Sequence, residues 1–372
     1  MSPLEVGNAV IAVAGLGSVG LWVWLATRTT DDGHPLPLAP RRPVPWGPGF
    51  GIIAVFWMML GVLTAQAPAS GSENDSINAA AADSSEGQPG AGATDDVAPT
   101  GNGLSGNGLS GNGPPGNGPP NNGPSGSEAV GGGAADRETG GRASKLSDAD
   151  YVRLTLQTSA AMLLLVAAVV GAIVLSYGGG RHDLGLPTSG QQLLSDVGLG
   201  LAAALAVLAP VYLTQLALTQ LAGWAPHHPS LDQLSRRPTW SVGMATVFAA
   251  AVVAPIVEEV LFRLLLQGWL EKAEDQRLGA LQAPRGNRSS PAGVPEGRPT
   301  GWAPVIVSSL CFSLAHFTHG PAPVALFFFG LVLGYVYQRT HRIVPCVVAH
   351  MAFNALSLSL HWLTIIAPAA GN

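Results

Sequence analysis

The stretch Trp240–Leu270 reads WSVGMATVFAAAVVAPIVEEVLFRLLLQGWL, and it is long and apolar enough to cross a membrane as one helix. It nevertheless contains two adjacent glutamates, Glu258 and Glu259, followed by an arginine, Arg263. A charged side chain at membrane depth costs at least ~2.5–3.5 kcal/mol on insertion scales. Three such residues in one helix therefore indicate a functional site inside a membrane protein.

The composition of the chain supports a membrane protein. Of its 372 residues, 47% are hydrophobic and only 11% are charged, whereas a soluble domain carries about 25% charged residues. No basic patch or basic stretch interleaved with aromatics is present, which argues against nucleic acid as a partner. The expected partners are the lipid bilayer and a peptide or membrane-protein substrate.

Apolar segments of about 20 residues predict membrane-spanning helices. We therefore predict an all-α, polytopic integral membrane bundle of about eight helices. The predicted spans are Asn8–Thr27, Gly49–Ala65, Leu154–Tyr177, Val197–Trp224, Trp240–Leu270, Ala303–Phe317, Pro321–Gln338 and Ile343–Ile366.

Composition also divides the chain into three parts. Residues 1–66 form a predicted two-helix transmembrane hairpin, and residues 146–372 form a six-helix body. Between them, residues 67–145 are rich in Gly, Pro, Asn and Ser and repeat motifs such as GNGLS and GNGPP. Such a segment buries too little apolar surface to offset its ordering entropy, so we predict a disordered linker. A second polar insert, residues 271–301, is predicted to be a loose loop.

The distribution of Lys and Arg predicts the orientation of these helices. The loops at 28–48, 178–196, 271–302 and 339–342 fall on one side of the membrane and carry most of the basic residues. Basic loops face the cytoplasm. Both termini and the 67–145 linker are therefore predicted to be non-cytoplasmic, in a membrane that we interpret as the bacterial inner membrane.

Helical spacing predicts different partners for the two glutamates. Glu259 and Arg263 are four residues apart, so they share a helix face and can form an ion pair. Glu258 is rotated by about 100° from Glu259 and is left for another partner. A carboxylate in a poorly solvated site beside imidazoles is suited to act as a general base.

Two other apolar segments carry the complementary groups. His350 and Asn354 are four residues apart and present an imidazole and a carboxamide on one face, which suits an oxyanion site or a metal ligand. His316 follows Phe312 by one helical turn and is the predicted partner of Glu258. All these groups reach similar depths in the membrane, so we expect the Glu258 carboxylate within about 6 Å of both imidazole rings.

These motifs resemble those of a known family. Residues 255–263, PIVEEVLFR, are similar to the EExxxR motif of the CPBP intramembrane proteases, which include the type II CAAX prenyl endopeptidases. Residues 312–316, FSLAH, resemble the FxxxH motif, and residues 350–354, HMAFN, resemble the HxxxN motif. The resemblance covers about 240–360. Family members usually have Gly after the motif Arg, where this chain has Leu264.

The resemblance implies a reaction and a role for each matched residue. The enzyme would be an intramembrane endopeptidase that cleaves near the C-terminus of a membrane-associated or lipidated substrate. Glu258 would activate water with help from His316, while His350 and Asn354 would stabilise the oxyanion.

The resemblance also implies supporting residues and leaves one cofactor open. Glu259 and Arg263 would support the architecture, together with Phe312. The family is often described as metalloproteases, although the same residues suit hydrolysis by glutamate-activated water without a tightly bound metal. No cofactor is firmly implied, and a divalent metal such as zinc stays open. Its ligands would be Glu258, His316 and His350.

Two alternatives to the protease hypothesis stay open from the sequence. The first is a catalytically silent membrane scaffold, such as a bacteriocin-immunity-type protein, in which the polar residues only hold helices together. The second is a proton- or ion-coupled transporter, in which buried charges line the path of the ion. Cleavage of peptides, or movement of ions across liposomes, would separate the three functions.

Overall fold

The computed structural model describes residues 3–28, 30, 33–39, 43–53, 56, 147–223, 229–282, 301–317, 320 and 322–366. The chain divides into one compact unit, made of Met1–Gln66 with Leu146–Asn372, and a second unit, Ala67–Lys145. The second unit, which includes the predicted disordered linker, lies outside the described residues.

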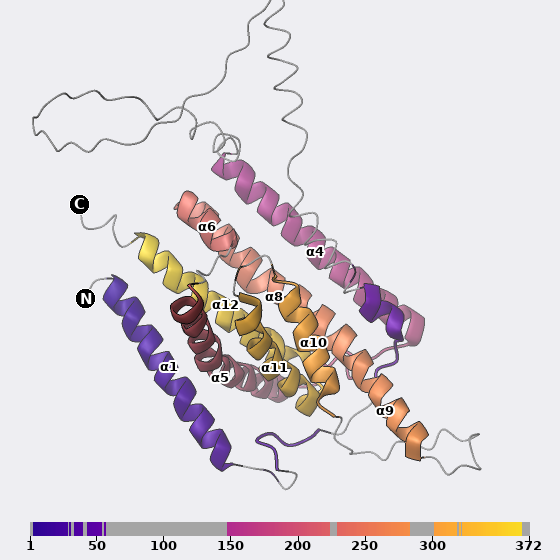
Figure 1. The fold of residues 1–372 in the computed structure, drawn as a ribbon. Helices are drawn as coiled ribbons and strands as arrows, with labels where there is room; N and C mark the ends of the chain where they lie inside the picture. Colours follow the sequence, from indigo (N-terminus) through magenta and orange to yellow (C-terminus); the bar gives the residue numbers. More distant parts are fainter. Residues whose placement is uncertain are drawn as a thin grey trace, which may run out of the picture. The chain divides into compact units, whose positions relative to one another are not determined.

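The described residues form helices and no strands, which confirms the all-α prediction (Figure 1). Polar caps begin two of the long helices: the Ser147 side chain accepts from the backbone N–H of Asp150, and the Ser189 side chain accepts from that of Gln192. The helices are α1 (Pro3–Thr27), α4 (Asp148–Tyr177), α5 (Gly190–Ala222), α6 (Pro229–Arg236), α7 (Trp240–Val247), η2 (Phe248–Val253), α8 (Ala254–Glu259), η3 (Val260–Gln267), α9 (Gly268–Gln282), α10 (Ala303–Leu314), α11 (Ala322–Thr340) and α12 (Ile343–Ile366).

Within the described residues, six helices are long and apolar enough to span a membrane. The predicted count of eight is therefore not confirmed. The segment predicted at Ala303–Phe317 contains α10, which has only 12 residues, and the predicted Gly49–Ala65 helix runs into residues outside the described part. The six spans are Ala9–Thr27, Asp148–Tyr177, Gly190–Ala222, Trp240–Arg277, Ala322–Thr340 and Ile343–Leu363.

The fourth span is one long helical rod built from α7, η2, α8, η3 and α9 (Figure 1). The prediction that residues 271–301 form a loose loop is wrong for its first part, because α9 continues to Gln282. Glu271 shows why: it is only 1% exposed, and its carboxylate accepts a hydrogen bond from Gln267, one turn earlier. Glu271, which the sequence placed at the start of the loop, is thus a buried residue of α9.

Close contacts between α-helical backbones hold the core of this unit together. Helices α5 and α12 lie side by side, as do α10 and α11 (Figure 1). At Gly200 of α5, an added Cβ would lie 2.7 Å from the Cβ of Val348 on α12. At Gly330 of α11, it would lie 2.9 Å from the Cβ of Ser309 on α10. Small residues at membrane helix contacts permit such close approach.

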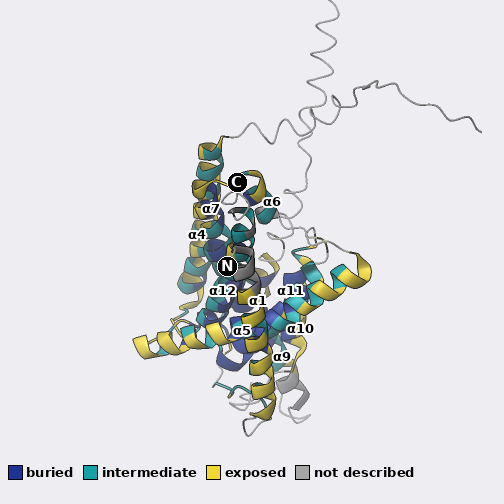
Figure 2. Ribbon diagram, turned by 90° about the vertical axis from the view of Figure 1, so that its left-hand side faces the viewer, coloured by how far each residue is buried: buried dark blue, intermediate teal, exposed yellow. Residues whose placement is uncertain are grey.

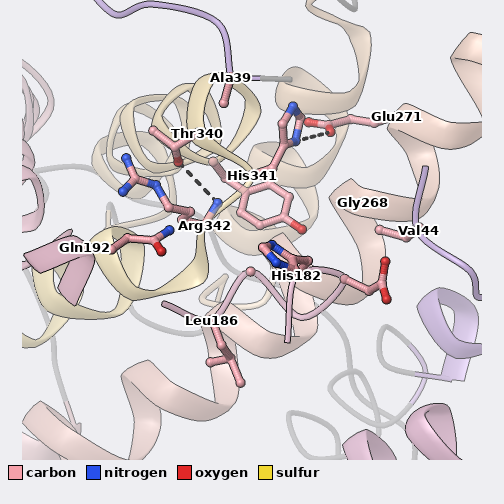
Figure 3. Close-up of a pocket in the computed structure, with 13 residues that line it drawn as sticks. Ala39, Val44, His182, Leu186, Gln192, Gly268, Glu271, Thr340, His341 and Arg342 are labelled. Carbon is pink, nitrogen blue, oxygen red and sulfur yellow. Dashed lines mark hydrogen bonds and ion pairs between the residues drawn. The ribbon is translucent and has the colours of Figure 1, made fainter. Parts of the chain in front are cut away.

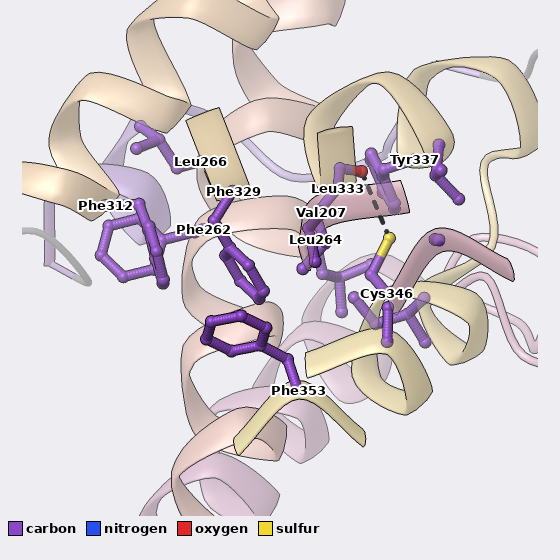
Figure 4. Packing of buried hydrophobic residues seen from close by; sticks show 14 of the residues in the cluster. Val207, Phe262, Leu264, Leu266, Phe312, Phe329, Leu333, Tyr337, Cys346 and Phe353 are labelled. Carbon is purple, nitrogen blue, oxygen red and sulfur yellow. Dashed lines mark hydrogen bonds between the residues drawn. The ribbon is translucent and has the colours of Figure 1, made fainter. Parts of the chain in front are cut away.

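The buried core lies where these helices meet, and the outer helices are largely exposed. Phe312, Phe329 and Phe353 bring α10, α11 and α12 together, and the Cys346 thiol donates to the Leu333 carbonyl at 3.4 Å (Figure 4). By contrast, α1 and much of α4 carry exposed residues, as expected for surfaces that face lipid (Figure 2). The packed aromatic core borders the polar groups described next.

Candidate active site

The two glutamates lie on α8, a short α-helical segment between two π-helical segments. The π-helix η2 precedes α8 and η3 follows it, so the rod is wider on either side of the glutamates. π-helical turns within α-helices occur frequently at functional sites, because the extra residue changes the direction of the neighbouring side chains. The local backbone thus sets where Glu258 and Glu259 point.

Glu258 lies beside both predicted histidines. Its Oε2 atom is 4.0 Å from Nε2 of His316, which follows the end of α10. The same oxygen is 3.8 Å from Nε2 of His350, on α12. The expected separation of about 6 Å or less is confirmed for both rings. Three segments that are far apart in the sequence therefore bring one carboxylate and two imidazoles together.

Glu259 occupies a different environment from its neighbour. Its side chain is fully buried, and its Oε2 lies 3.1 Å from Nε of Arg263, which confirms the predicted i,i+4 ion pair. Its other oxygen, Oε1, lies 2.8 Å from Nδ1 of His350. The second contact was not predicted from the sequence, which assigned Glu259 to Arg263 alone. His350 therefore contacts both glutamates, one through each ring nitrogen.

The hydrogen bonds assign the proton on one nitrogen of each imidazole. Nδ1 of His316 lies 2.9 Å from the carbonyl oxygen of Phe312. A carbonyl can only accept, so this nitrogen carries a hydrogen, and Nε2 faces Glu258. In the same way, Nδ1 of His350 donates to the Glu259 carboxylate. A neutral His350 would then carry no hydrogen on Nε2.

Aromatic rings form one wall of the site. The Phe312 ring lies 5.0 Å from the His316 ring and 5.8 Å from the His350 ring. The Arg263 guanidinium lies 5.3 Å from the centre of the same Phe312 ring, within the range of a cation–π contact. Phe329 of α11 meets His350 edge to face at 4.9 Å. The sequence predicted a supporting role for Phe312, but no motif or spacing identified Phe329.

Asn354 lies one turn beyond His350 on α12, as predicted, but its amide has a backbone partner. Its Nδ2 donates to the carbonyl oxygen of Ala250, in η2, at 2.8 Å. The sequence predicted that Asn354 would share an oxyanion site with His350. The observed bond directs one amide hydrogen toward the helix that carries Glu258.

The side chains of this site differ in how far they are exposed. The side chains of Glu258 and His316 are 25% and 19% exposed, whereas those of Glu259 and Arg263 are fully buried. A molecule approaching the group would therefore meet Glu258 and His316 first. Glu259 and Arg263 can act on it only through other side chains.

The predicted metal ligands were Glu258, His316 and His350. Across the part of the chain that the structure describes, no group of three or more His, Cys, Asp and Glu side chains is arranged to hold a metal ion. Nδ1 of His350 is engaged with Glu259, and its Nε2 faces Glu258. The proposed reaction does not use a metal.

A separate polar cavity of 360 Å³ lies near the junction of α11 and α12, and none of its lining residues belongs to the Glu258 group (Figure 3). His341 has a positive φ of 50° at this junction, and its Nδ1 lies 3.7 Å from Oε2 of Glu271. Asp196 of α5 and Arg342 form an ion pair beside it. The sequence did not predict this cavity, because its charged lining residues come from α9 and from loops that are far apart in the sequence.

The helical spans and the polar group between them define an integral membrane protein with a candidate hydrolytic site. Residues 239–356 match the family model described as type II CAAX prenyl endopeptidase Rce1-like. Every residue predicted for the site lies inside the matched range. This match supports an intramembrane endopeptidase of the CAAX protease type. No curated protein and no solved structure matches the chain.

Proposed function

We propose that this protein is an intramembrane endopeptidase that hydrolyses peptide bonds with water activated by Glu258. The observation that carries the proposal is the placement of one Glu258 oxygen 4.0 Å from His316 and 3.8 Å from His350. A single water molecule can reach both Glu258 and His316. The Rce1-like match supports the same class of reaction.

In the proposed reaction, the attacking water lies between Glu258 and His316. Since Nδ1 of His316 donates to Phe312, its Nε2 can accept from the water while Glu258 accepts from the other side. Glu258 takes one proton as the water oxygen attacks the scissile carbonyl carbon. The same proton then passes to the leaving amine as the carbon–nitrogen bond breaks. The products are a carboxylic acid and an amine, and Glu258 is regenerated.

His350 is proposed to stabilise the oxyanion of the tetrahedral intermediate. Because Nδ1 donates to Glu259, Nε2 can donate to an oxyanion only when the ring is protonated. An imidazolium at this position would face two carboxylates, Glu258 and Glu259.

We further propose the substrate class and the cellular setting. The scissile bond lies near the C-terminus of a membrane-associated or lipidated peptide or protein, and the lipid bilayer presents it to the site. The protein resides in a bacterial inner membrane with both termini outside the cytoplasm, a proposal supported by the Lys and Arg distribution. The low-complexity segment 67–145 would then be a non-cytoplasmic linker.

The proposal is tested with the full chain, purified and reconstituted in liposomes. Internally quenched peptides are added, some of them carrying a lipid near the C-terminus, and the products are identified by mass spectrometry. Liposomes with the Glu258→Gln variant serve as a blank for contaminating proteases. Cleavage above that blank is expected. Its absence across the peptides would favour a silent scaffold, and ion flux reported by an entrapped dye would favour a transporter.

A further inference from the structure

We propose that Asn354 is a positioning residue: it holds Glu258 in place by satisfying a backbone carbonyl that Pro255 leaves without a donor. The proposal rests on the proposed function and concerns the same site. Its central observation is the 2.8 Å hydrogen bond from Nδ2 of Asn354 to the carbonyl oxygen of Ala250. The two residues lie on different helices, α12 and η2.

The backbone pattern explains why the Ala250 carbonyl needs this donor. In a π-helix, each carbonyl accepts from the N–H five residues later. The Ala254 N–H follows that pattern and donates to Ala249. If the π-helical pattern continued by one residue, the next donor would be the nitrogen of residue 255, which would reach Ala250. That residue is Pro255, and proline has no backbone N–H.

A carbonyl that loses its helical partner is costly inside a membrane. Water is not available in the hydrocarbon region, so a proline in a spanning helix is tolerated when a neighbouring helix supplies the missing donor. Asn354 supplies it from α12. The carboxamide is suited to this task, because its NH₂ group donates and carries no charge.

The bond forms one half of a two-point attachment between α12 and the rod that carries Glu258. Asn354 holds the rod at Ala250, before Glu258, and His350 holds it at Glu259, directly after Glu258. The two holding residues are one helical turn apart. The attachment therefore fixes the position of the Glu258 carboxylate against the His350 ring, 3.8 Å away.

A double-mutant cycle separates this role from direct contact with the substrate. Asn354→Leu removes the donor at similar volume, and Pro255→Ala restores a backbone N–H that can reach Ala250. In the proline background, Asn354→Leu is expected to lower kcat roughly tenfold or more at an unchanged KM. In the Pro255→Ala background, the same substitution is expected to lower kcat by no more than about threefold.

The result that would overturn the proposal is an equal loss of kcat in both backgrounds, as expected if the Asn354 amide touches the reacting oxygen.

Thermal unfolding in detergent provides a second experiment that needs no substrate. There, Asn354→Leu is expected to lower Tm in the proline background and to lower it much less with Pro255→Ala. If the wild type cleaves no peptide, the proposed function fails. Equal losses of Tm in both backgrounds would separately refute the role of Asn354 at Ala250. If Asn354→Leu alone does not accumulate, recovery of folded protein in the double variant is the expected result, and no recovery contradicts the proposal.

Discussion

His350 joins two adjacent glutamates through the two nitrogens of one ring: Nδ1 lies 2.8 Å from Glu259, and Nε2 lies 3.8 Å from Glu258. The two carboxylates nevertheless differ in surroundings. Glu259 is fully buried and paired with Arg263, whereas the Glu258 side chain is 25% exposed. One ring thus connects a structural carboxylate with a carboxylate that a substrate can reach.

This asymmetry predicts different effects of the same substitution at adjacent positions. Glu259→Gln removes the charge that balances the buried Arg263, so it should lower the free energy of unfolding by about 3–5 kcal/mol. Glu258→Gln, the matched control, should change it by less than about 1 kcal/mol. The measurement is thermal or denaturant unfolding in detergent. Equal destabilisation by both substitutions would contradict the division of roles.

His316 is expected to contribute to catalysis without contributing much to stability. His316→Ala removes the Nε2 atom that faces Glu258, and loss of one acid–base partner typically lowers kcat about 100- to 10,000-fold. Steady-state cleavage of a quenched peptide measures the effect. His361→Ala is the control, because that ring pairs with the exposed Ser235 and lies outside the site. A His316→Ala enzyme with wild-type kcat would remove His316 from the mechanism.

The close contact between α10 and α11 should be sensitive to a single methyl group. Gly330→Ala would place a Cβ 2.9 Å from Ser309, and overpacking of this kind costs about 1–3 kcal/mol. Since His316 follows α10, kcat should also fall. Gly171→Ala on α4 is the matched control, because nothing lies within 4 Å of its new Cβ. If both variants unfold at the same temperature, the contact is less tight than described.

Metal removal tests the proposed use of water without a metal. Dialysis against 1,10-phenanthroline and EDTA should leave peptide cleavage unchanged, since Glu258 and His316 suffice to activate the water in the proposed reaction. Metal content measured by mass spectrometry on the same sample verifies the removal. Loss of activity that zinc restores would instead assign a metal to Glu258, His316 and His350.

The sequence predicted local relationships better than contacts between helices. The Glu259–Arg263 pair follows from helical spacing within one segment, and the similar depths of Glu258, His316 and His350 follow from counting residues along each span. Both relationships depend only on the geometry within each helix. The all-α class follows in the same way from the apolar segments.

Contacts between helices could not be predicted in this manner. The contact of His350 with Glu259 depends on the rotation of α12 against the rod, which no spacing within a helix specifies. The π-helical segments η2 and η3 change that rotation further, because each departs from the 100° per residue assumed for an α-helix. The partner of Asn354 was missed for the same reason, although Pro255 signalled that a nearby carbonyl would need a donor.

The turnover of Glu258→Gln tests the proposed reaction most directly. The full-length variant and the wild type are reconstituted at equal folded amounts, and kcat is measured on the same peptide. Without the carboxylate to take the proton from water, kcat should fall about 100- to 10,000-fold while Tm stays near that of the wild type. A Glu258→Gln enzyme that cleaves the peptide at the wild-type rate would contradict water activation by Glu258.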